Sequence, residues 1–507
     1  MEFSRRQFLA ATGLGTAGLL AVTACGTSSS DGGSPRNGGT LRVGALGKAS
    51  KIERDPHKTL SNDSDFLIAS LVFDPLTVPA ANPNVAPRLA SSWKQLDDPR
   101  SWRFTIAQGA AFHDGAAVRP EDVVWSLRRL REIAGETKVP VASGDAITAD
   151  GADGVIITTM APNRDLPMLL RLMTFVVKAG TTDFTAAVGS GPFRLESYND
   201  GNARLVRNET WHGGAPRVDA IEVRRFESNT ALSNAVMAGQ IDLASNVGAV
   251  AGRTAAGRGD LSVVRRANDI VIPIVMRTAD GPFADARVRN ALRLAVDRDV
   301  MVKQITSGYG TAANDVLGTA DPTYDTTLPK RGRDIVRAKA LLAEAKFDTG
   351  RTYPLVTKDE AVGEVDSARL FATQAAEIGV KLDVVVQDAN VFYDETWLKA
   401  PLYTANWGTN DSVIFFASKT MISTTKWNEA GTHDPDLDAA YLRALSATDD
   451  AGYSSASREI QRIEYDRGGY LVWGTADGVD VASRKVRDLP TLAGYGRVQL
   501  ERTWLAG

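Results

Sequence analysis

The sequence predicts an α/β protein in which helices cover a sheet. Strand-like and helix-like segments mix through all 507 residues without a repeat period, which is typical of α/β or α+β folds. In the second half, helical spacing of apolar residues predicts helices at Ile335–Ala345 and Ser367–Ile378. Strands are predicted at Thr352–Val356 and Val380–Val386. This succession of helix and strand favours the α/β class.

The rest of the chain shows the same two kinds of segment. Alternating or β-rich stretches predict strands at Thr40–Leu46 and Ser101–Ile106, and Asn82–Asn84 is predicted to be a turn. Val118–Arg131 is predicted to be a helix, because a proline and two acidic residues stand at its start. Arg287–Ile305 is predicted to be one long amphipathic helix.

The composition is that of an ordinary globular chain. It is 43% hydrophobic and 23% charged, with a formal net charge of −3 at pH 7. The length suggests two or three domains. A slightly acidic chain is a poor match for nucleic acid, so we expect no nucleic-acid partner.

A signal peptide is predicted over residues 1–24. Arg5 and Arg6 precede the uncharged run Phe8–Ala24, which is too short and too rich in glycine for a good membrane span. The arginine pair resembles a twin-arginine export signal, and the Val-Thr-Ala-Cys ending at Cys25 resembles the bacterial lipobox. We therefore expect Cys25 to be lipidated. The alternatives are an ordinary signal peptide with an accidental cysteine, an N-terminal anchor helix, and the general export route.

Residues 25–39 are predicted to be the lipidated cysteine and a flexible tether, because Thr27–Gly39 is rich in Ser, Gly and Asn. Cys25 is the only cysteine in the sequence, so its lipidation would leave no free thiol and no disulfide. A domain held in this way would lie outside the cytoplasm, at the outer face of the cytoplasmic membrane, and would touch that membrane through its lipid.

Catalytic patterns are weak in this sequence. The four histidines, His57, His113, His212 and His433, are widely spaced, and no two have a metal-ligand spacing. The sequence has no Gly-Lys-Ser phosphate loop and no Gly-x-Ser-x-Gly elbow. Ser423 and Lys426 fit a Ser-x-x-Lys pattern that arises readily by chance. We expect no enzyme activity, no cofactor and no metal site.

Several motifs, in order along the chain, carry a resemblance to a known family. They are Phe112–Gly115 (FHDG), Pro120–Leu130 (PEDVVWSLRRL), Gly189–Tyr198 (GSGPFRLESY), Phe283–Arg298 (FADARVRNALRLAVDR) and the helix start at His433–Leu442. Together they resemble the bacterial extracellular solute-binding proteins of family 5, the peptide/nickel/opine-binding class that serves ABC importers.

The resemblance implies a two-lobed fold of the periplasmic-binding-protein type II, in its enlarged peptide-binding form, with two hinge crossings. Residues 40–270 are then expected to form lobe I, with a subdomain at about 75–188. Residues 271–478 are expected to form lobe II, and residues 479–507 to return to lobe I. The leader and the tether precede these parts.

The resemblance also implies a function without chemistry. A lipid-anchored, monomeric protein would capture an oligopeptide-like, metal-chelate or other small organic solute and deliver it to an ABC permease of the inner membrane. A secreted lipoprotein hydrolase and a ligand sensor that signals to a membrane partner are the alternatives.

Leu402–Phe416 (LYTANWGTNDSVIFF) is the candidate binding segment, because aromatics there interleave with polar side chains. Composition alone favours a buried strand with Trp407 in the core, followed by a polar turn. The family carries a W-x-x-D element here, whose acid takes a peptide's α-amino group. In this sequence Asn410 occupies the acidic position and Asp411 follows, so the resemblance implies a site of Trp407, Asn410 and Asp411 with the peptide class in question. Arg277 could meet an anion or form a surface ion pair.

Overall fold

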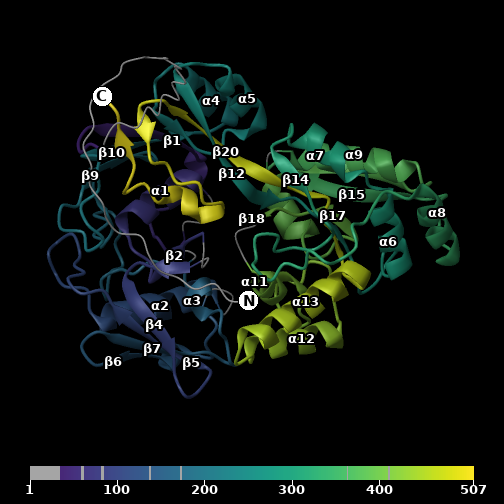
Figure 1. Ribbon diagram of the computed structural model, residues 1–507, viewed down its shortest axis with the longest axis horizontal. Coiled ribbons are helices and arrows are strands. Elements are labelled where there is room, and N and C mark those ends of the chain that lie inside the picture. The colour runs from purple at the N-terminus through teal and green to yellow at the C-terminus, as the bar shows by residue number, and fades with distance from the viewer. Residues whose placement is uncertain are drawn as a thin grey trace, which may run out of the picture. The chain divides into compact units, whose positions relative to one another are not determined.

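The computed structural model describes residues 35–58, 62–81, 85–135, 139–171, 174–361, 363–408 and 412–507. Arg36–Gly507 forms one compact unit, drawn in Figure 1. The predicted leader with Cys25 and the predicted turn at Asn82–Asn84 lie outside the described residues. Within the described ranges, no helix has the length and apolar character needed to cross a membrane.

The first lobe is organised around β1 (Thr40–Leu46), which pairs in parallel with strands on both sides. Leu41, Val43 and Ala45 alternate along this strand and are buried, so they share one covered face of the sheet. The other strands on this side are β8 (Phe193–Asn199), β9 (Asn202–Arg207), β10 (Ala220–Phe226) and β11 (Leu243–Ala244). The accompanying helices are α1 (Asp63–Val72), α4 (Asn229–Met237) and α5 (Gly248–Ala256).

A small antiparallel sheet forms a second layer of this lobe. Its strand order is β4-β5-β7-β6, and Val123, Leu127 and Leu130 of α2 (Pro120–Ala134) are buried in its core. The strands are β4 (Ala90–Gln95), β5 (Ser101–Ile106), β6 (Ile147–Asp150) and β7 (Gly154–Thr158). The antiparallel pair of β2 (Thr77–Pro79) and β3 (Val85–Pro87) precedes this sheet in the sequence. The short helix α3 (Leu166–Leu169) follows it.

The second lobe contains a five-stranded sheet in the described residues, with the order β16-β15-β17-β13-β19. The strands are β13 (Ile274–Met276), β15 (Thr352–Lys358), β16 (Lys381–Gln387), β17 (Leu402–Thr404) and β19 (Tyr470–Leu471). The helices are α6 (Ala286–Ala295), α7 (Arg298–Ile305), α8 (Ile335–Glu344), α9 (Glu364–Ala376), α10 (Ala389–Val391), α11 (Val413–Phe416), α12 (Pro435–Leu445) and α13 (Asp450–Arg467).

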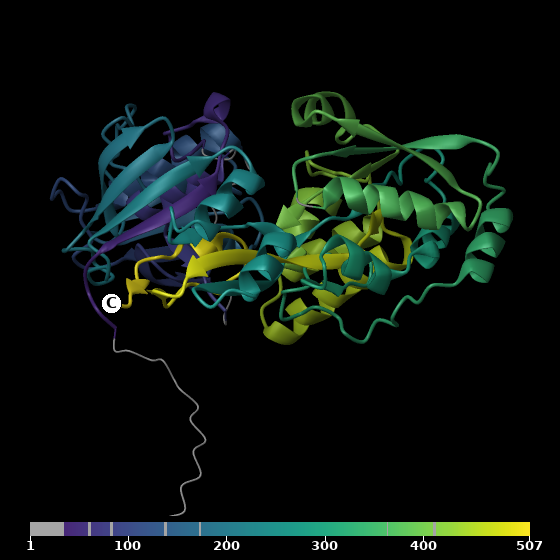
Figure 2. The same ribbon diagram turned by 90° about the horizontal axis from the view of Figure 1, so that it is seen from above.

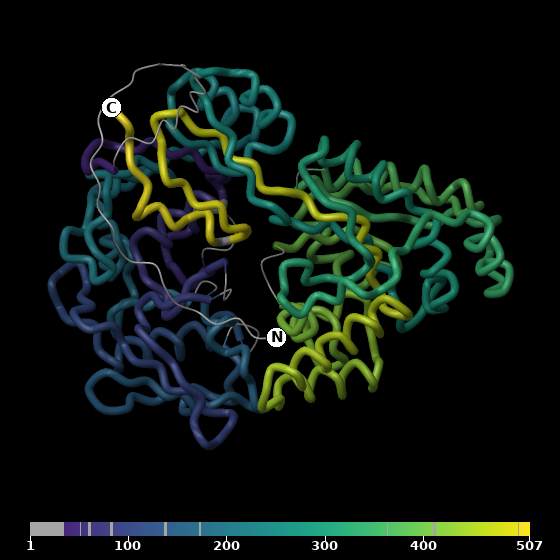
Figure 3. The backbone as a smooth tube through the Cα atoms, viewed as in Figure 1, coloured from purple at the N-terminus to yellow at the C-terminus, as the bar shows by residue number. Residues whose placement is uncertain are grey.

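Two long antiparallel strands run between the lobes. β12 (Leu261–Val271) pairs with β20 (Gly474–Ser483), and Figure 2 shows β20 leading from the second lobe into the first. Two short strands of the second lobe extend this pairing: β14 (Gly310–Ala312) pairs with the start of β20, and β18 (Trp407–Gly408) pairs with the end of β12. The chain then closes on the first lobe with β21 (Val486–Arg487) and β22 (Trp504–Leu505), as the yellow tube of Figure 3 shows. Two chain passages thus connect the lobes.

The predicted strands and most predicted helices are confirmed, with ends shifted by a few residues. The single helix predicted at Arg287–Ile305 is wrong, because the structure has two helices, α6 and α7, in its place. The break falls at Val296 and Asp297, which have extended backbones. The Asp297 side chain accepts a hydrogen bond from the Val300 amide (3.0 Å), so it caps the start of α7.

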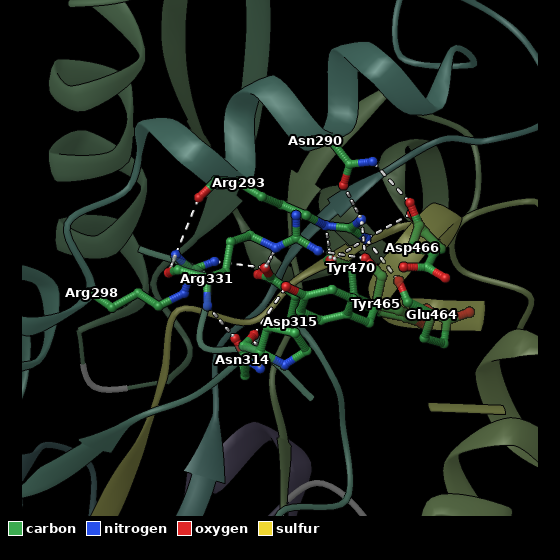
Figure 4. Close-up of polar contacts among 12 residues, drawn as sticks. Asn290, Arg293, Arg298, Asn314, Asp315, Arg331, Glu464, Tyr465, Asp466 and Tyr470 are labelled. Carbon is green, nitrogen blue, oxygen red and sulfur yellow. Dashed lines mark hydrogen bonds and ion pairs between the residues drawn. The ribbon is translucent and has the colours of Figure 1, made fainter. Parts of the chain in front are cut away.

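An arginine cluster fixes α6 against the end of α13 (Figure 4). Arg293 is fully buried and donates to the carbonyl oxygens of Tyr470 (2.7 Å) and Gly468 (2.8 Å). On the other side of the cluster, the Asp315 carboxylate forms ion pairs with Arg298 (2.7 Å) and Arg331 (2.8 Å). The motif at Phe283–Arg298 therefore supplies side chains that hold the second lobe together.

Glu464 is the unusual member of this arginine cluster. It is 1% exposed, and neither of its carboxylate oxygens has a hydrogen-bond partner among the described residues. Burial raises its pKa to about 7, although the nearby charges of Arg293 and Arg289 act in the opposite direction.

Candidate functional site

A cavity of about 420 Å³ lies where the two lobes and the two connecting strands meet. From the first lobe it is lined by Asp63, Pro79, Asn246 and Arg497, among others. From the second lobe it is lined by Glu360, Asn406, Trp407, Phe415 and Trp427, among others. Asp269 and Asp477 come from β12 and β20. A cavity of this size, with aromatic walls and a few polar groups, suits a small organic ligand.

Aromatic rings form a row on the second-lobe wall. The ring centroids of Trp407 and Trp427 are 6.3 Å apart, and Trp397 lies 5.9 Å from Trp427. Tyr393 continues the row at 5.6 Å from Trp397. Trp407 and Trp427 are half-buried and line the cavity, so they offer surface on which a flat or apolar ligand group can stack.

A buried carboxylate, Glu429, holds this aromatic row in place. It is 2% exposed and accepts hydrogen bonds from Trp397 Nε1 (2.9 Å), Trp407 Nε1 (3.3 Å) and the Tyr470 hydroxyl (2.8 Å). Burial raises its pKa, and the three donors partly offset that rise. Because the two indoles donate to the two oxygens of one carboxylate, their orientations are coupled.

A cavity cluster of Lys358, Glu360, Glu364, Tyr393 and Asn406 lies at the end of β15. Lys358 and Glu364 are buried and form an ion pair of 2.8 Å. Glu360 is 43% exposed on its side chain, lines the cavity, and accepts a hydrogen bond from the Tyr393 hydroxyl (2.7 Å). Asn406 donates weakly to both glutamates. This cluster brings carboxylate to the cavity wall beside the aromatic row.

The other acidic side chains of the cavity are paired with arginines. Asp63 forms an ion pair with Arg497 (2.8 Å). Asp269 pairs with Arg266 (3.2 Å) on β12, and Asp477 pairs with Arg265. Each of these three carboxylates thus has an arginine beside it, although Arg266 also pairs with Asp480.

A second set of polar contacts joins the lobes away from β12 and β20. Arg164 of the first lobe donates to Asp450 (2.5 Å) and to the carbonyl of Asp449 (2.9 Å), at the start of α13. The Tyr453 hydroxyl donates to Asp165 (2.8 Å), and the Arg164 guanidinium lies 4.6 Å from the Tyr453 ring centroid. We call these five residues the lobe contact.

Of the site residues predicted from sequence, Trp407 lines the cavity, and its role in binding stays a prediction. Asn410 and Asp411 lie outside the described residues. Arg277 forms the surface ion pair, with Asp280 at 2.8 Å. Sequence reasoning missed Glu360 and Trp427, which line the cavity, and Glu429, which accepts hydrogen bonds from the aromatic row. Among the described residues, no group of three or more His, Cys, Asp or Glu could hold a metal ion.

Comparison with known proteins places the chain in a class of two-lobed binding proteins. Residues 84–429 match the profile described as "Bacterial extracellular solute-binding proteins, family 5 Middle", and the chain belongs to this family. Its fold is that of the type II binding proteins, and its members are solute-binding proteins of ABC importers.

Similar proteins differ in what they bind. The "Probable di/tripeptide-binding protein 5" of Pseudomonas aeruginosa is 26% identical over 366 residues, 65% of this chain and 68% of that protein. The substrate-binding protein CtaP of Listeria monocytogenes superposes with a TM-score of 0.81 at 20% identity, over 93% of this chain and 100% of that one. NikA of Brucella suis, in complex with Fe(III)-EDTA, superposes with a TM-score of 0.80 at 18% identity. The superposition covers 92% of this chain and 100% of that one.

Proposed function

We propose that this protein encloses a small organic solute in the cavity between its lobes, outside the cytoplasmic membrane, and delivers it to an ABC permease. The observation that supports this proposal most is the cavity itself, because both lobes and both connecting strands line it. A ligand that touches both walls stabilises the closed arrangement, which a permease can then distinguish from the open one. A sensor would use the same cavity with a different membrane partner.

The hinge of this movement is proposed to lie in β12 and β20. The pairing of these strands is irregular between Arg266 and Ile270, so their register changes midway between the lobes. Division into residues 40–270, 271–478 and 479–507 would place one boundary at the end of β12 and the other within β20. The lobe contact would then form on closure and separate on opening.

The experiment that tests this function is small-angle scattering with and without ligand. The ligand is first released from gently purified protein by denaturation and identified by mass spectrometry. Rebinding it should make the protein more compact, because closure brings two rigid lobes together. Equal radii of gyration in both states, with binding confirmed by calorimetry, would contradict closure about a hinge.

The class of ligand is tested at Asn410 and Asp411, whose chemistry differs in charge only. If Asp411 binds an ammonium group, Asp411→Asn should weaken binding about tenfold or more, since a charge-assisted hydrogen bond contributes roughly 1.5–3 kcal/mol. If the ligand has no ammonium group, Asp411→Asn should leave the affinity nearly unchanged, and Asn410→Asp should weaken binding. We propose the second outcome, because the family's acidic position is an amide in this chain.

Membrane attachment is proposed to come from a lipid on Cys25, after export by the twin-arginine route. The proposal rests on the sequence around Arg5, Arg6 and Cys25. Cys25→Ala should move the protein from the membrane fraction to the soluble fraction, and Arg5→Lys with Arg6→Lys should retain precursor in the cytoplasm. A Cys25→Ala protein that stays with the membrane would refute the lipid anchor.

A further inference from the structure

The cavity has an acidic end at Glu360, although its lining also includes the basic side chains of Arg171, Lys419 and Arg497. Glu360 lines this end, and its three polar contacts all fall on one oxygen, Oε2. The Tyr393 hydroxyl donates to that oxygen at 2.7 Å, Asn406 Nδ2 at 3.4 Å, and Lys358 Nζ lies at 3.5 Å. None of these contacts uses Oε1.

Among the described residues, the cation within ion-pair distance of Glu360 is Lys358, and it is already engaged. Lys358 Nζ lies closer to Glu364 (2.8 Å) than to Glu360 (3.5 Å), and both members of the closer pair are at most 1% exposed on their side chains. Two carboxylates therefore share one ammonium, so the cavity cluster keeps one net negative charge. The Glu360 side chain is 43% exposed, and a ligand cation that displaces solvent from it would gain a charge-assisted hydrogen bond.

Glu360 differs in this respect from the other acidic side chains that line the cavity in the described residues. Asp63, Asp269 and Asp477 each lie within ion-pair distance of an arginine. Arg266 also pairs with Asp480, but Asp269 Oδ1 accepts from the Gly494 amide in addition. Among the described residues, Glu360 has neither an arginine partner nor a donor on Oε1, and this open carboxylate lies at the end where Asn406 and Trp407 also line the wall.

Aromatic rings lie on the same wall as this charge. Trp407 and Trp427 line the cavity, and the chain of contacts from Glu360 through Tyr393 and Trp397 reaches both. The face of an indole attracts a cation, most strongly where water is excluded. Carboxylate and indole together favour an organic cation over a metal ion, which would need several oxygen ligands.

We propose that this end of the cavity is a subsite for the cationic end of an organic solute, an alkylammonium or guanidinium group, with Glu360 as the residue that selects for charge. The proposal deepens the proposed function and rests on it. Glu360 accepts the cation's N–H groups, while Trp407 and Trp427 cover its apolar stem.

Matched probes that differ in charge test the cation subsite. The first pair is Nα-acetyl-arginine amide and Nα-acetyl-citrulline amide, and the second is Nα-acetyl-lysine amide and Nα-acetyl-norleucine amide. Equilibrium dialysis with detection by mass spectrometry measures retention of each member. Wild-type protein should retain a cationic member about tenfold or more over its neutral partner, and Glu360→Gln should abolish that preference.

The control variant is Asp366→Asn, which makes the same change of charge on α9, on a side chain that is 71% exposed and does not line the cavity. It should keep the wild-type preference. The proposal is overturned if no cationic member is retained, if neutral members are retained equally, if the preference survives Glu360→Gln, or if Asp411→Asn rather than Glu360→Gln removes it.

Failure of the subsite and failure of the proposed function look different in this experiment. If wild-type protein releases no solute on denaturation and retains none from a metabolite extract, the proposed function itself is refuted. If wild type and Glu360→Gln retain the same solute equally, only the cation subsite is refuted.

Discussion

The second lobe contains two groups of charged side chains, the arginine cluster and the cavity cluster, and their charges are paired in different ways. In the arginine cluster, Arg293 donates to backbone carbonyls of β19 and of the segment after α13, and Asp315 takes two guanidinium groups. In the cavity cluster, one lysine serves two glutamates, and one of these faces the cavity. The first group pairs its guanidinium groups with carbonyls and a carboxylate of the chain and stabilises the fold, with Glu464 left without a hydrogen-bond partner among the described residues. The second leaves a charge for a ligand.

The largest effect should follow from breaking the arginine cluster. Arg293→Met removes both guanidinium donors to the Tyr470 carbonyl. It also removes one of two side-chain donors to the Gly468 carbonyl, which keeps Arg289. Loss of one partner from a buried charged network costs about 3–5 kcal/mol. Urea unfolding followed by circular dichroism should show a decrease of this size in the free energy of unfolding.

Arg369→Met is the matched control, because Arg369 lies on α9 with its side chain 64% exposed. It should change the free energy of unfolding by well under about 1 kcal/mol. Folded Arg293→Met protein should still bind ligand with wild-type affinity. A stable Arg293→Met protein with weakened binding would reverse the assignment of roles to the two groups.

A second effect concerns pH, through Glu464 of the arginine cluster. Its folded pKa is raised to about 7 from an ordinary 4.5, so between these values the folded state holds a proton that the unfolded state has lost. The contribution of Glu464 to stability is thus full below about pH 4.5 and declines as pH rises to about 7, by about 3 kcal/mol in all.

Glu464→Gln should remove this decline. Unfolding free energies measured at pH 5 and pH 8 should therefore differ less in Glu464→Gln than in wild type. Parallel changes with pH in the two proteins would show that Glu464 does not hold its proton in the folded state.

A third prediction concerns the aromatic wall, where affinity rather than stability should change. Trp407→Ala removes a stacking surface and apolar contact area, so affinity for the released ligand should fall on the order of a hundredfold. Trp407→Phe keeps a ring but loses the hydrogen bond to Glu429, and its loss should be smaller. Calorimetry on both variants measures this, and wild-type affinity in Trp407→Ala would exclude Trp407 from the site.

The sequence predicts the fold better than it predicts the site, for a physical reason. Helices and strands follow from local periodicity, so the segments at Thr40–Leu46 and Ile335–Ala345 are confirmed. The break between α6 and α7 escapes this reasoning, because apolar spacing continues across Asp297 while its side chain starts a new helix. One local cap outweighs a periodic pattern there.

The site depends on contacts between distant segments. Trp407 could be singled out because aromatic, amide and acidic residues are neighbours in the sequence. Glu360 meets Asn406 across 46 residues and Glu429 meets Trp407 across 22, and no local pattern encodes either contact. A carboxylate in an ordinary surface-like stretch becomes a cavity residue only through the order of strands β15 and β17 in the sheet.

The smallest expected effect concerns the lobe contact, whose charged groups belong to neither buried group. Tyr453→Phe removes the hydroxyl that donates to Asp165 at 2.8 Å and leaves the aromatic ring beside Arg164. A hydrogen bond to a carboxylate contributes about 1.5 kcal/mol at the lower end of its range, so affinity should fall roughly tenfold. Because the lost bond joins the lobes and not the ligand, the change should appear as faster ligand release, measured by stopped-flow tryptophan fluorescence.

Tyr465→Phe is the matched control for this last prediction. Tyr465 lies on the same helix, α13, but its hydroxyl donates to Pro329 within the second lobe, at 3.0 Å. Removing it should leave the release rate unchanged, since opening the lobes does not break that bond. Equal release rates for wild type, Tyr453→Phe and Tyr465→Phe would mean that the lobe contact does not hold the closed form. Closure would then depend on the ligand and the connecting strands alone. The unmatched charge at Glu360 would become a stronger candidate for the interaction that holds the two walls on the solute.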